Sequence, residues 1–145
     1  MFENKLADLN EEKNLKSKDI SKYLHVHEST YSEWKHSKIP IPTKRLIELA
    51  DFYHINIDYM IGLSKNKITI DKATVIDLKL IGERLKTTRK KLNLSLRNLG
   101  NKLNFSFSAF ASYERGEKLI NSEILISFCE ATGVSIDWIL GRTDY

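Results

Sequence analysis

Segment 106–116, Ser-Phe-Ser-Ala-Phe-Ala-Ser-Tyr-Glu-Arg-Gly, carries the side chains of this sequence that are best suited to recognise another molecule. If the segment is helical, Phe110 and Tyr113 lie three residues apart on one face, which we expect to be buried. The residues expected to face outward are Phe107, Ser108, Ala111 and Ser112. Short polar side chains can approach the edges of DNA bases closely, and a phenyl ring can contact the methyl group of thymine. The segment therefore indicates contact with bases.

Residue types that could support catalysis or metal binding form no comparable pattern. All the histidines lie in the first half, without the regular spacing and further ligands of a zinc site; they are His25, His27, His36 and His54. The single Cys129 excludes an internal disulfide and a multi-cysteine metal site. No local pattern places a nucleophile beside a base, and no glycine-rich loop could cradle phosphates. We expect no enzyme activity, metal, cofactor or small-molecule substrate, and we interpret the histidines as capping or surface residues.

The elements that must position segment 106–116 belong to a unit that occurs twice. When the chain is shifted against itself by 79 residues, so that Leu6 meets Leu85, the two halves match without a gap. Further identical pairs are Leu24 with Leu103, Ser29 with Ser108, Asp58 with Asp137 and Gly62 with Gly141. Large apolar residues also meet large apolar residues, as Trp34 meets Tyr113. Such matching is what two copies of one core require.

Each copy is predicted to form five short helices, and the second copy shows this pattern most clearly. The expected N-terminal caps of its second to fifth helices are Ser95, Ser106, Asn121 or Ser122, and Ser135. The expected C-terminal stops are Asn93, Asn104, Gly116, Gly133 and Gly141. One side of its first helix is expected to carry Leu80, Leu85, Arg89 and Leu92. In the first copy, the third helix should end at Ser37 and the fourth should start near Pro42-Thr43.

The duplication predicts an all-α protein with two tandem five-helix domains, at residues 1–63 and 77–145, and a linker at 64–76. From Ser64 to Thr74 the linker is polar apart from Ile68 and Ile70. These two alternate, so a short extended piece could dock on a domain, and a plain linker is the other alternative. Fully extended, its first eleven residues could span about 35 Å, which is close to one turn of B-DNA, roughly 34 Å.

Charge differs between the halves. Residues 1–66 carry ten Lys or Arg and ten Asp or Glu, whereas residues 67–145 carry 13 and nine, so the net charge of +4 lies in the second half. A basic excess favours polyanionic partners. The N-terminus has no apolar core of signal-peptide length, and no stretch approaches the roughly 20 apolar residues of a membrane span. We therefore expect a cytoplasmic protein with no membrane partner.

Both halves resemble the phage-repressor or Cro-type helix-turn-helix family, also called the xenobiotic-response-element family. The second copy carries Ile81-Gly-Glu-Arg-Leu-Lys, Leu94-Ser-Leu-Arg-Asn-Leu, Tyr113-Glu-Arg-Gly-Glu-Lys and Val134-Ser-Ile-Asp-Trp-Ile-Leu-Gly. The first copy carries Ile55-Asn-Ile-Asp-Tyr-Met-Ile-Gly at the place of the last string. The resemblance covers nearly the whole chain except the linker. It implies lambda-repressor-like five-helix domains that bind double-stranded DNA, commonly form dimers and regulate transcription.

The resemblance also implies which residues face DNA. The recognition helices fall at about 27–36 and 106–115. Base-reading positions fall on His27, Glu28, Ser29, Ser32 and Glu33 in the first copy, and on Ser106, Phe107, Ser108, Ala111 and Ser112 in the second. Phosphate-contacting positions fall on Ser17, Lys18, Lys35 and Lys38 in the first copy, and on Ser95, Leu96, Arg97, Arg115 and Lys118 in the second. Backbone N–H groups at these helix N-termini would also face phosphates.

The sequence departs from the family pattern at two places. Ser17 and Leu96 stand where the family often has Gln at the start of the second helix. Glu28 and Glu33 stand on the reading surface of the first copy, where carboxylates can accept from cytosine but repel the phosphate backbone. The second copy is therefore the stronger candidate for DNA contact.

Two functions follow as hypotheses. The first is a sequence-specific double-stranded DNA-binding transcriptional regulator that acts as a repressor. The alternative is a protein-interaction module on a helix-turn-helix scaffold, such as an antirepressor, an antitoxin-like protein or a dimerisation partner, and a homodimer is compatible with both. A dense basic run also has two interpretations, a solvated helix face or a surface that attracts DNA; it comprises Arg84, Lys86, Arg89, Lys90 and Lys91.

Overall fold

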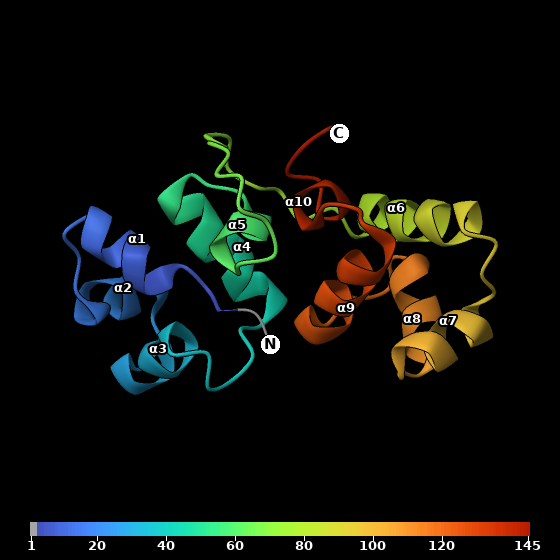
Figure 1. Ribbon diagram of the computed structural model, residues 1–145, viewed down its shortest axis with the longest axis horizontal. Coiled ribbons are helices and arrows are strands. Elements are labelled where there is room, and N and C mark those ends of the chain that lie inside the picture. The colour runs from blue at the N-terminus through green and yellow to red at the C-terminus, as the bar shows by residue number, and fades with distance from the viewer. Residues whose placement is uncertain (1–2) are drawn as a thin grey trace. The chain divides into compact units, whose positions relative to one another are not determined.

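The computed structural model describes residues 3–145, and its regular structure in this range is helical (Figure 1). The chain divides between Ala73 and Thr74 into two compact units. The first contains α1 (Leu6–Glu12), α2 (Ser17–Leu24), α3 (Glu28–Lys35), α4 (Thr43–Tyr53) and α5 (Ile57–Met60). The second contains α6 (Leu78–Lys91), α7 (Leu96–Leu103), α8 (Phe107–Glu114), α9 (Ser122–Thr132) and α10 (Ile136–Ile139). The predicted all-α fold with two tandem five-helix units is confirmed. No described helix is long and apolar enough to cross a membrane.

The two units repeat the same helices in the same register. Adding 79 to the bounds of α2, α3, α4 and α5 gives the bounds of α7, α8, α9 and α10. The first helices end in the same register, at Glu12 and Lys91, but α6 begins at Leu78 whereas α1 begins at Leu6, which corresponds to Leu85. The duplication seen in the sequence is therefore a duplication of backbone structure.

Positions with a left-handed backbone repeat as well. In the first unit they are Asn14, His25, Ser37, His54 and Gly62, and in the second Asn93, Asn104, Gly116, Gly133 and Gly141. Each follows a helix, where a positive φ lets backbone N–H groups reach the last carbonyls. His25 and His54 are the C-terminal caps of α2 and α4, which confirms a capping role for these two histidines.

The units differ in how their helices begin. Every helix of the second unit has an N-cap side chain that accepts a backbone N–H; these caps are Asp77, Ser95, Ser106, Asn121 and Ser135. None of the N-cap residues of α1 to α5 does so. In α2 the Asp19 carboxylate instead accepts the Lys16 N–H at 2.9 Å. The four caps predicted for the second copy are confirmed, with Asn121 rather than Ser122 at α9.

The buried side of α6 differs from the expected one. Ile81, Leu85 and Arg89 are buried, but Leu80 is only half-buried and Leu92 is exposed, so the predicted stripe is wrong at these two leucines. Leu92 lies beyond the last helical residue as the C-cap, where the helical periodicity no longer applies. The face that includes Gly82 packs on the end of α8, where a Cβ at Gly82 would lie 2.4 Å from the Glu114 carbonyl oxygen. Close packing of α6 therefore fixes the end of the predicted recognition helix.

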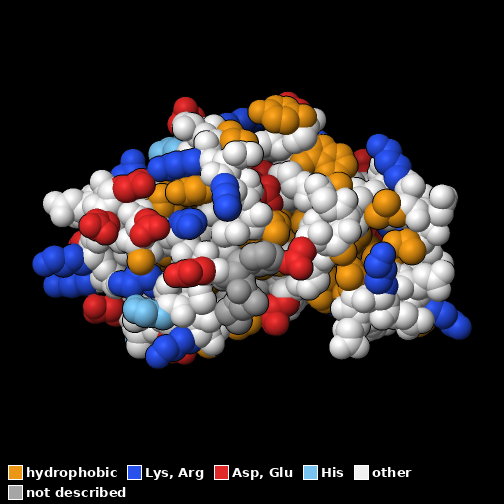
Figure 2. Space-filling view, viewed as in Figure 1, with side chains coloured by type: hydrophobic (Ala, Val, Ile, Leu, Met, Phe, Trp, Pro, Cys, Tyr) orange, Lys and Arg blue, Asp and Glu red, His pale blue; other side chains and the backbone are white. Residues whose placement is uncertain are grey.

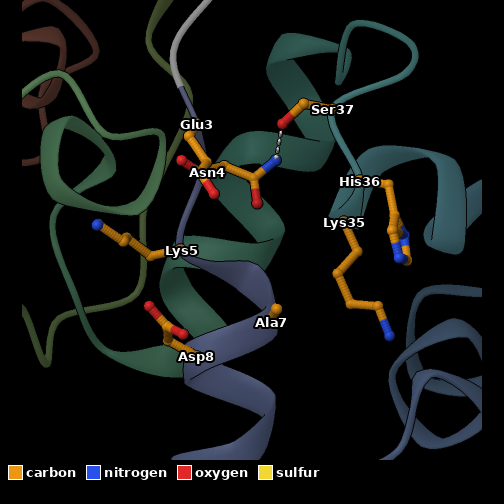
Figure 3. Close-up of a pocket in the computed structure, with 8 residues that line it drawn as sticks. All are labelled: Glu3, Asn4, Lys5, Ala7, Asp8, Lys35, His36 and Ser37. Carbon is orange, nitrogen blue, oxygen red and sulfur yellow. Dashed lines mark hydrogen bonds between the residues drawn. The ribbon is translucent and has the colours of Figure 1, made fainter.

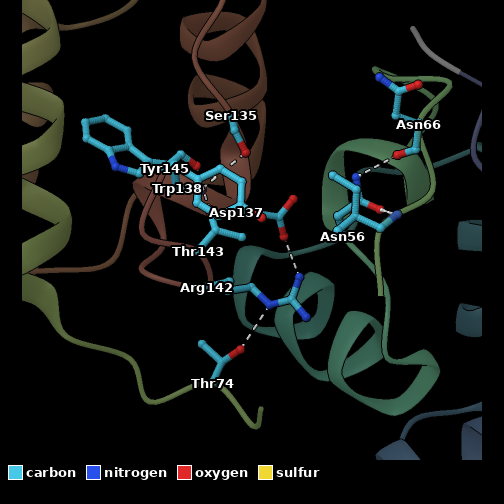
Figure 4. Close-up of polar contacts among 10 residues, drawn as sticks. Asn56, Asn66, Thr74, Ser135, Asp137, Trp138, Arg142, Thr143 and Tyr145 are labelled. Atoms are coloured by element: carbon cyan, nitrogen blue, oxygen red, sulfur yellow. Dashed lines mark hydrogen bonds and ion pairs between the residues drawn. The ribbon is translucent and has the colours of Figure 1, made fainter. Parts of the chain in front are cut away.

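The segment between the copies is docked rather than free over part of its length. Ile55 and Thr69 form an antiparallel bridge, and Ile70 is buried in the first unit. The Asn56 side chain donates to the Asn66 carbonyl at 3.0 Å and accepts the Ile68 N–H at 2.8 Å (Figure 4). The docked alternative is therefore the observed one, and the full linker length is not available as free reach.

The start of the second unit is held to that unit's last residues. Arg142 forms a buried ion pair with Asp137, and its Nε donates to the Thr74 hydroxyl at 3.0 Å (Figure 4). Between the docked Ile70 and the bound Thr74 only residues 71–73 intervene. Four Cα–Cα steps span at most about 15 Å, well below the reach expected for an extended linker.

Candidate nucleic-acid interface

Helices α7 and α8 are joined by a tight turn whose geometry depends on two residues. Asn104 ends α7 with φ 59°, and a side chain at Gly100 would meet the Phe105 carbonyl oxygen at 2.7 Å. After this turn, the Phe105 ring stacks on the buried Phe110 ring of α8, with 5.2 Å between centroids. Phe110 also contacts Phe128 of α9. The core therefore grips one side of α8 and leaves the start of the helix at the surface.

The exposed start of α8 carries three of the predicted base-reading residues. Ser106, Phe107 and Ser108 are exposed, and Ala111 is half-buried. Ser112, which we expected to face outward, is buried, and its hydroxyl donates to the Ala109 carbonyl at 2.6 Å. That expectation is wrong because Ser112 lies next to the inward-facing Tyr113 and close enough to α8's own backbone to bond it.

Cationic side chains lie at the predicted phosphate positions of the second unit. Arg97 is exposed on the first turn of α7, and its guanidinium lies over the Phe107 ring, 5.8 Å from the centroid. Arg115 and Lys118 are exposed beyond the end of α8. The Arg115 guanidinium donates to Glu117, and this hydrogen bond lowers the pKa of the Glu117 carboxyl. The structure thus brings Arg97 and Phe107 together and holds Arg115 in a solvent-exposed ion pair that a phosphate could replace.

An ion pair behind α8 was missed by the sequence-based prediction. Arg89 of α6 donates through Nε and Nη2 to both carboxylate oxygens of Glu114, at 2.6 and 2.9 Å, and through Nη1 to the Leu94 carbonyl. Both side chains are nearly buried. The hydrogen bonds to Glu114 raise the pKa of Arg89. The pair ties the first helix to the end of the recognition helix, and its signal was Arg89 standing on the side of α6 expected to be apolar.

The basic run on α6 therefore divides into two groups. Arg89 is structural, and Arg84 donates to the carbonyls of Trp138 and Thr143 while its guanidinium lies 4.9 Å from the Trp138 ring centroid. Lys86, Lys90 and Lys91 are exposed. The three lysines of the run thus face solvent, whereas its two arginines hold helices together.

In the first unit, the corresponding surface is built from α2 and α3. The exposed residues at the predicted positions are Lys18, His27, Glu28, Ser29, Glu33 and Lys38, while Ser17, Ser32 and Lys35 are half-buried. Lys35 donates to the Ser17 hydroxyl at 2.7 Å, which brings two predicted phosphate contacts together at the start of α2. This surface therefore combines cations with two exposed carboxylates on α3.

The first unit fills the site of the buried ion pair differently. Asn10 and Lys35 stand at the positions of Arg89 and Glu114. The Asn10 Oδ1 atom accepts the hydroxyls of both Tyr31, at 2.8 Å, and Tyr53. Burial raises the pKa of both tyrosines. Because this cluster needs no carboxylate at position 35, the Lys35 ammonium is available at the surface of α2 and α3.

Charge on the visible surface of the first unit is mixed. Over α1 and α2, acidic and basic side chains are interspersed on the face shown in Figure 2, in line with its equal numbers of acidic and basic residues up to position 66. The net charge of the first unit therefore gives it no overall attraction for a polyanion.

A pocket of about 570 Å³ lies in the first unit between the start of α1 and the end of α3 (Figure 3). Its lining includes the acidic residues Glu3 and Asp8 and the basic residues Lys5 and Lys35. The Asn4 side-chain amide donates a hydrogen bond to the Ser37 hydroxyl at 3.1 Å. Such a lining does not favour one class of charged ligand. Within residues 3–145, no group of three or more His, Cys, Asp or Glu side chains is placed to hold a metal ion.

Comparison with known proteins is consistent with this geometry. A family model described as helix-turn-helix matches residues 6–60 and 85–139. The chain is 34% identical over 62 residues to the cryptic phage CTXphi transcriptional repressor RstR of Vibrio cholerae serotype O1, a match that covers 43% of this chain and 55% of that protein. The chain thus spans about half the length of this curated relative.

Two crystal structures of the clp gene regulator ClgR from Corynebacterium glutamicum also match, each at 31% identity over 45% of this chain. Their TM-scores are 0.41 and 0.40, and the matches cover 69% and 84% of those chains.

Proposed function

This chain belongs to the helix-turn-helix family of the phage-repressor type, in two copies, and we propose that it is a sequence-specific double-stranded DNA-binding transcriptional repressor. The observation that carries the proposal is the exposed start of α8, which has Arg97 beside it and is held from behind by the core, with the exposed cations Arg115 and Lys118 beyond the end of the helix. A relative named as a phage transcriptional repressor supports the assignment of a repressor.

In this proposal the second unit makes the principal DNA contacts. The start of α8 enters the major groove, where Phe107, Ser108 and Ala111 face base edges. Arg97, Arg115, Lys118 and the N–H groups at the start of α7 contact phosphates on either side, with Ser95 capping that helix. The first unit adds weaker contacts through Ser17, Lys18, Lys35 and Lys38.

The test is duplex binding by the whole chain at several salt concentrations. Wild-type protein should bind duplexes selected from a random pool, and affinity should fall steeply as salt rises. Replacing Lys118 with Ala should weaken binding to all sequences by a similar factor and reduce the salt dependence by about one phosphate contact. Lys72→Ala, which removes the same charge from the exposed segment between the units, is the matched control. No duplex binding at low salt would refute the proposal.

A second function is favoured by the acidic face of α3. Glu28 and Glu33 are exposed on the first unit's recognition helix, where they oppose phosphates and could bind a protein instead. If this face binds DNA, the double change Glu28→Gln and Glu33→Gln in the whole chain should strengthen duplex binding, because it removes two repulsive charges. If the face forms a homodimer or binds a basic protein surface, the same variant should lose self-association or partner binding, measured by analytical ultracentrifugation, with DNA affinity unchanged.

A further inference from the structure

Phe107 is the one large apolar side chain on the predicted reading face of α8. It is the first residue of the helix, and 47% of its surface is exposed. Its counterpart in the first unit is the charged Glu28, so the fold of the unit does not require an aromatic residue here. Covering an exposed phenyl ring with an apolar group is favourable in water.

The hydroxyl groups beside Phe107 are already engaged within α8. Ser106 Oγ accepts the Ala109 N–H and lies 2.9 Å from Ser108 Oγ, and Ser112 bonds its own helix from a buried position. Ala111 contributes only a methyl group. The predicted reading face therefore offers few uncommitted hydrogen-bonding groups, and its main outward feature is the Phe107 ring.

The Phe107 side chain contacts α7. Phe107 Cβ lies in van der Waals range of the position that a side chain at Gly100 would occupy, so α7 passes directly against the first turn of α8. The Arg97 guanidinium lies over the face of the Phe107 ring, 5.8 Å from its centroid. A cation in this position is attracted to the ring and restrains it. The same arginine brings a positive charge to the side of the ring that would approach DNA.

Only one group exposed in the major groove matches an apolar ring. Each base pair presents hydrogen-bond donors and acceptors there, and thymine adds a methyl group at C5. Cytosine methylated at C5 carries the same group at the same position. We propose that the second unit selects DNA sites by a pyrimidine C5-methyl group packed against Phe107. This inference rests on the proposed DNA-binding function.

The test combines a base change with a protein change. Duplexes selected by the wild-type chain are scanned by replacing each thymine with uracil, which removes only the C5-methyl group. At one position, wild-type affinity should fall about fourfold, the factor expected for one buried methyl-sized group. Phe107→Ala should bind thymine and uracil duplexes equally at that position. Leu92→Ala, which removes another side chain that is 47% exposed in the same unit, should keep the fourfold difference.

A second arm distinguishes the two sources of the methyl group. At the sensitive position, the thymine–adenine pair is replaced by a cytosine–guanine pair with or without a C5-methyl group on cytosine. Tighter binding of the methylated form by wild type, but not by Phe107→Ala, assigns recognition to the methyl group itself. A methyl preference with thymine alone restricts the inference to thymine.

Two results would overturn the inference. One is equal binding of thymine and uracil duplexes by the wild-type chain at every position. The other is a Phe107→Ala variant that keeps the preference for the methylated base, with Trp138 fluorescence showing that the second unit is folded. Failure of wild type to bind any duplex would refute the proposed function and this inference together, so the two failures are distinguishable.

Discussion

Position 35 and its counterpart 114 show how single residues separate the two units. Glu114 is nearly buried and pairs with Arg89, so it serves to fasten α8 to α6. Lys35 stands at the same place in α3 but bonds Ser17 at the surface, and the core behind it contains Asn10 and two tyrosines instead. The residue at this position thus forms a nearly buried ion pair in the second unit and a hydrogen bond at the surface of the first.

The Arg89–Glu114 pair gives the first prediction. Glu114→Ala should destabilise the second unit by about 3 kcal/mol or more, because it leaves the Arg89 guanidinium buried without its counter-charge. Urea unfolding followed by Trp138 fluorescence, in a Trp34→Phe background, measures the free energy of unfolding of this unit. Arg115→Ala breaks the ion pair with Glu117, in which both side chains are exposed, and should leave the urea midpoint of the second unit unchanged. A Glu114→Ala variant as stable as wild type would show that the pair has no net role.

The tyrosine cluster gives a prediction for alkaline pH. Burial raises the pKa of Tyr31 and Tyr53 in the folded state above the unfolded value of about 10. Their contribution to stability is therefore fully present below pH 10 and is lost as the pH rises through the folded-state values. The first unit should unfold in this range, with tyrosinate absorbance rising together with the change in Trp34 fluorescence. The double variant Tyr31→Phe, Tyr53→Phe should lack this coupled step; if it keeps the step, other groups cause it.

At the level of helices, the units differ most in their N-termini. Serines, asparagine and aspartate cap all five helices of the second unit, whereas α1 to α5 begin at Lys, His, Pro or Asn residues whose side chains accept no cap bond. Each such bond contributes about 1 kcal/mol to stability. The second unit therefore has an N-cap bond at every helix, whereas at the starts of α1 and α2 in the first unit the side chains of Asn4 and Asp19 accept backbone N–H groups instead.

Exchange of caps between equivalent positions tests this difference. Lys16→Ser introduces the hydroxyl that Ser95 has in the second unit, and it can accept the Asp19 N–H while Asp19 already accepts the N–H of residue 16. This reciprocal pair should stabilise the first unit by about 1 kcal/mol. Ser95→Ala should destabilise the second unit by a similar amount. Urea midpoints from Trp34 and Trp138 fluorescence check both, and a first unit unaffected by Lys16→Ser would contradict the capping explanation.

The helices were predictable from the sequence because their ends are marked by local chemistry. Ser95 and Ser106 favour the start of a helix, and Gly133 favours the end of one. The match at a shift of 79 residues then placed the corresponding helix ends in the first copy. Contacts between helices were less predictable. The Arg89–Glu114 pair and the Asn10 cluster join residues 21 to 43 positions apart, and a charged residue on an amphipathic helix gives no local sign of its partner. Ser112 was wrongly predicted to face outward because its hydroxyl bonds the Ala109 carbonyl of the same helix.

At the level of the whole chain, the segment between the copies limits how the two units can act together. Residues 66–70 belong structurally to the first unit through Asn56 and the Ile55–Thr69 bridge, and Thr74 belongs to the second through Arg142. Only residues 71–73 intervene, and the Asp71 carboxylate lies 3.9 Å from the His54 ring nitrogen of the first unit. Binding of both units to sites one DNA turn apart would be easier if residues 66–70 were released.

Release of this segment is the last prediction, and limited trypsin digestion measures it. Asn56→Ala removes two hydrogen bonds to the segment, each worth about 1 kcal/mol, so the released state should become about thirtyfold more populated and cleavage after Lys67 correspondingly faster. Asn66→Ala is the matched control, because only the backbone of Asn66 takes part in the docking. Trp34 fluorescence must show a folded first unit in both variants, so that faster cleavage reports release of the segment and not unfolding. Equal cleavage after Lys67 in wild type and Asn56→Ala would mean that the bridge and Ile70 hold the segment without Asn56.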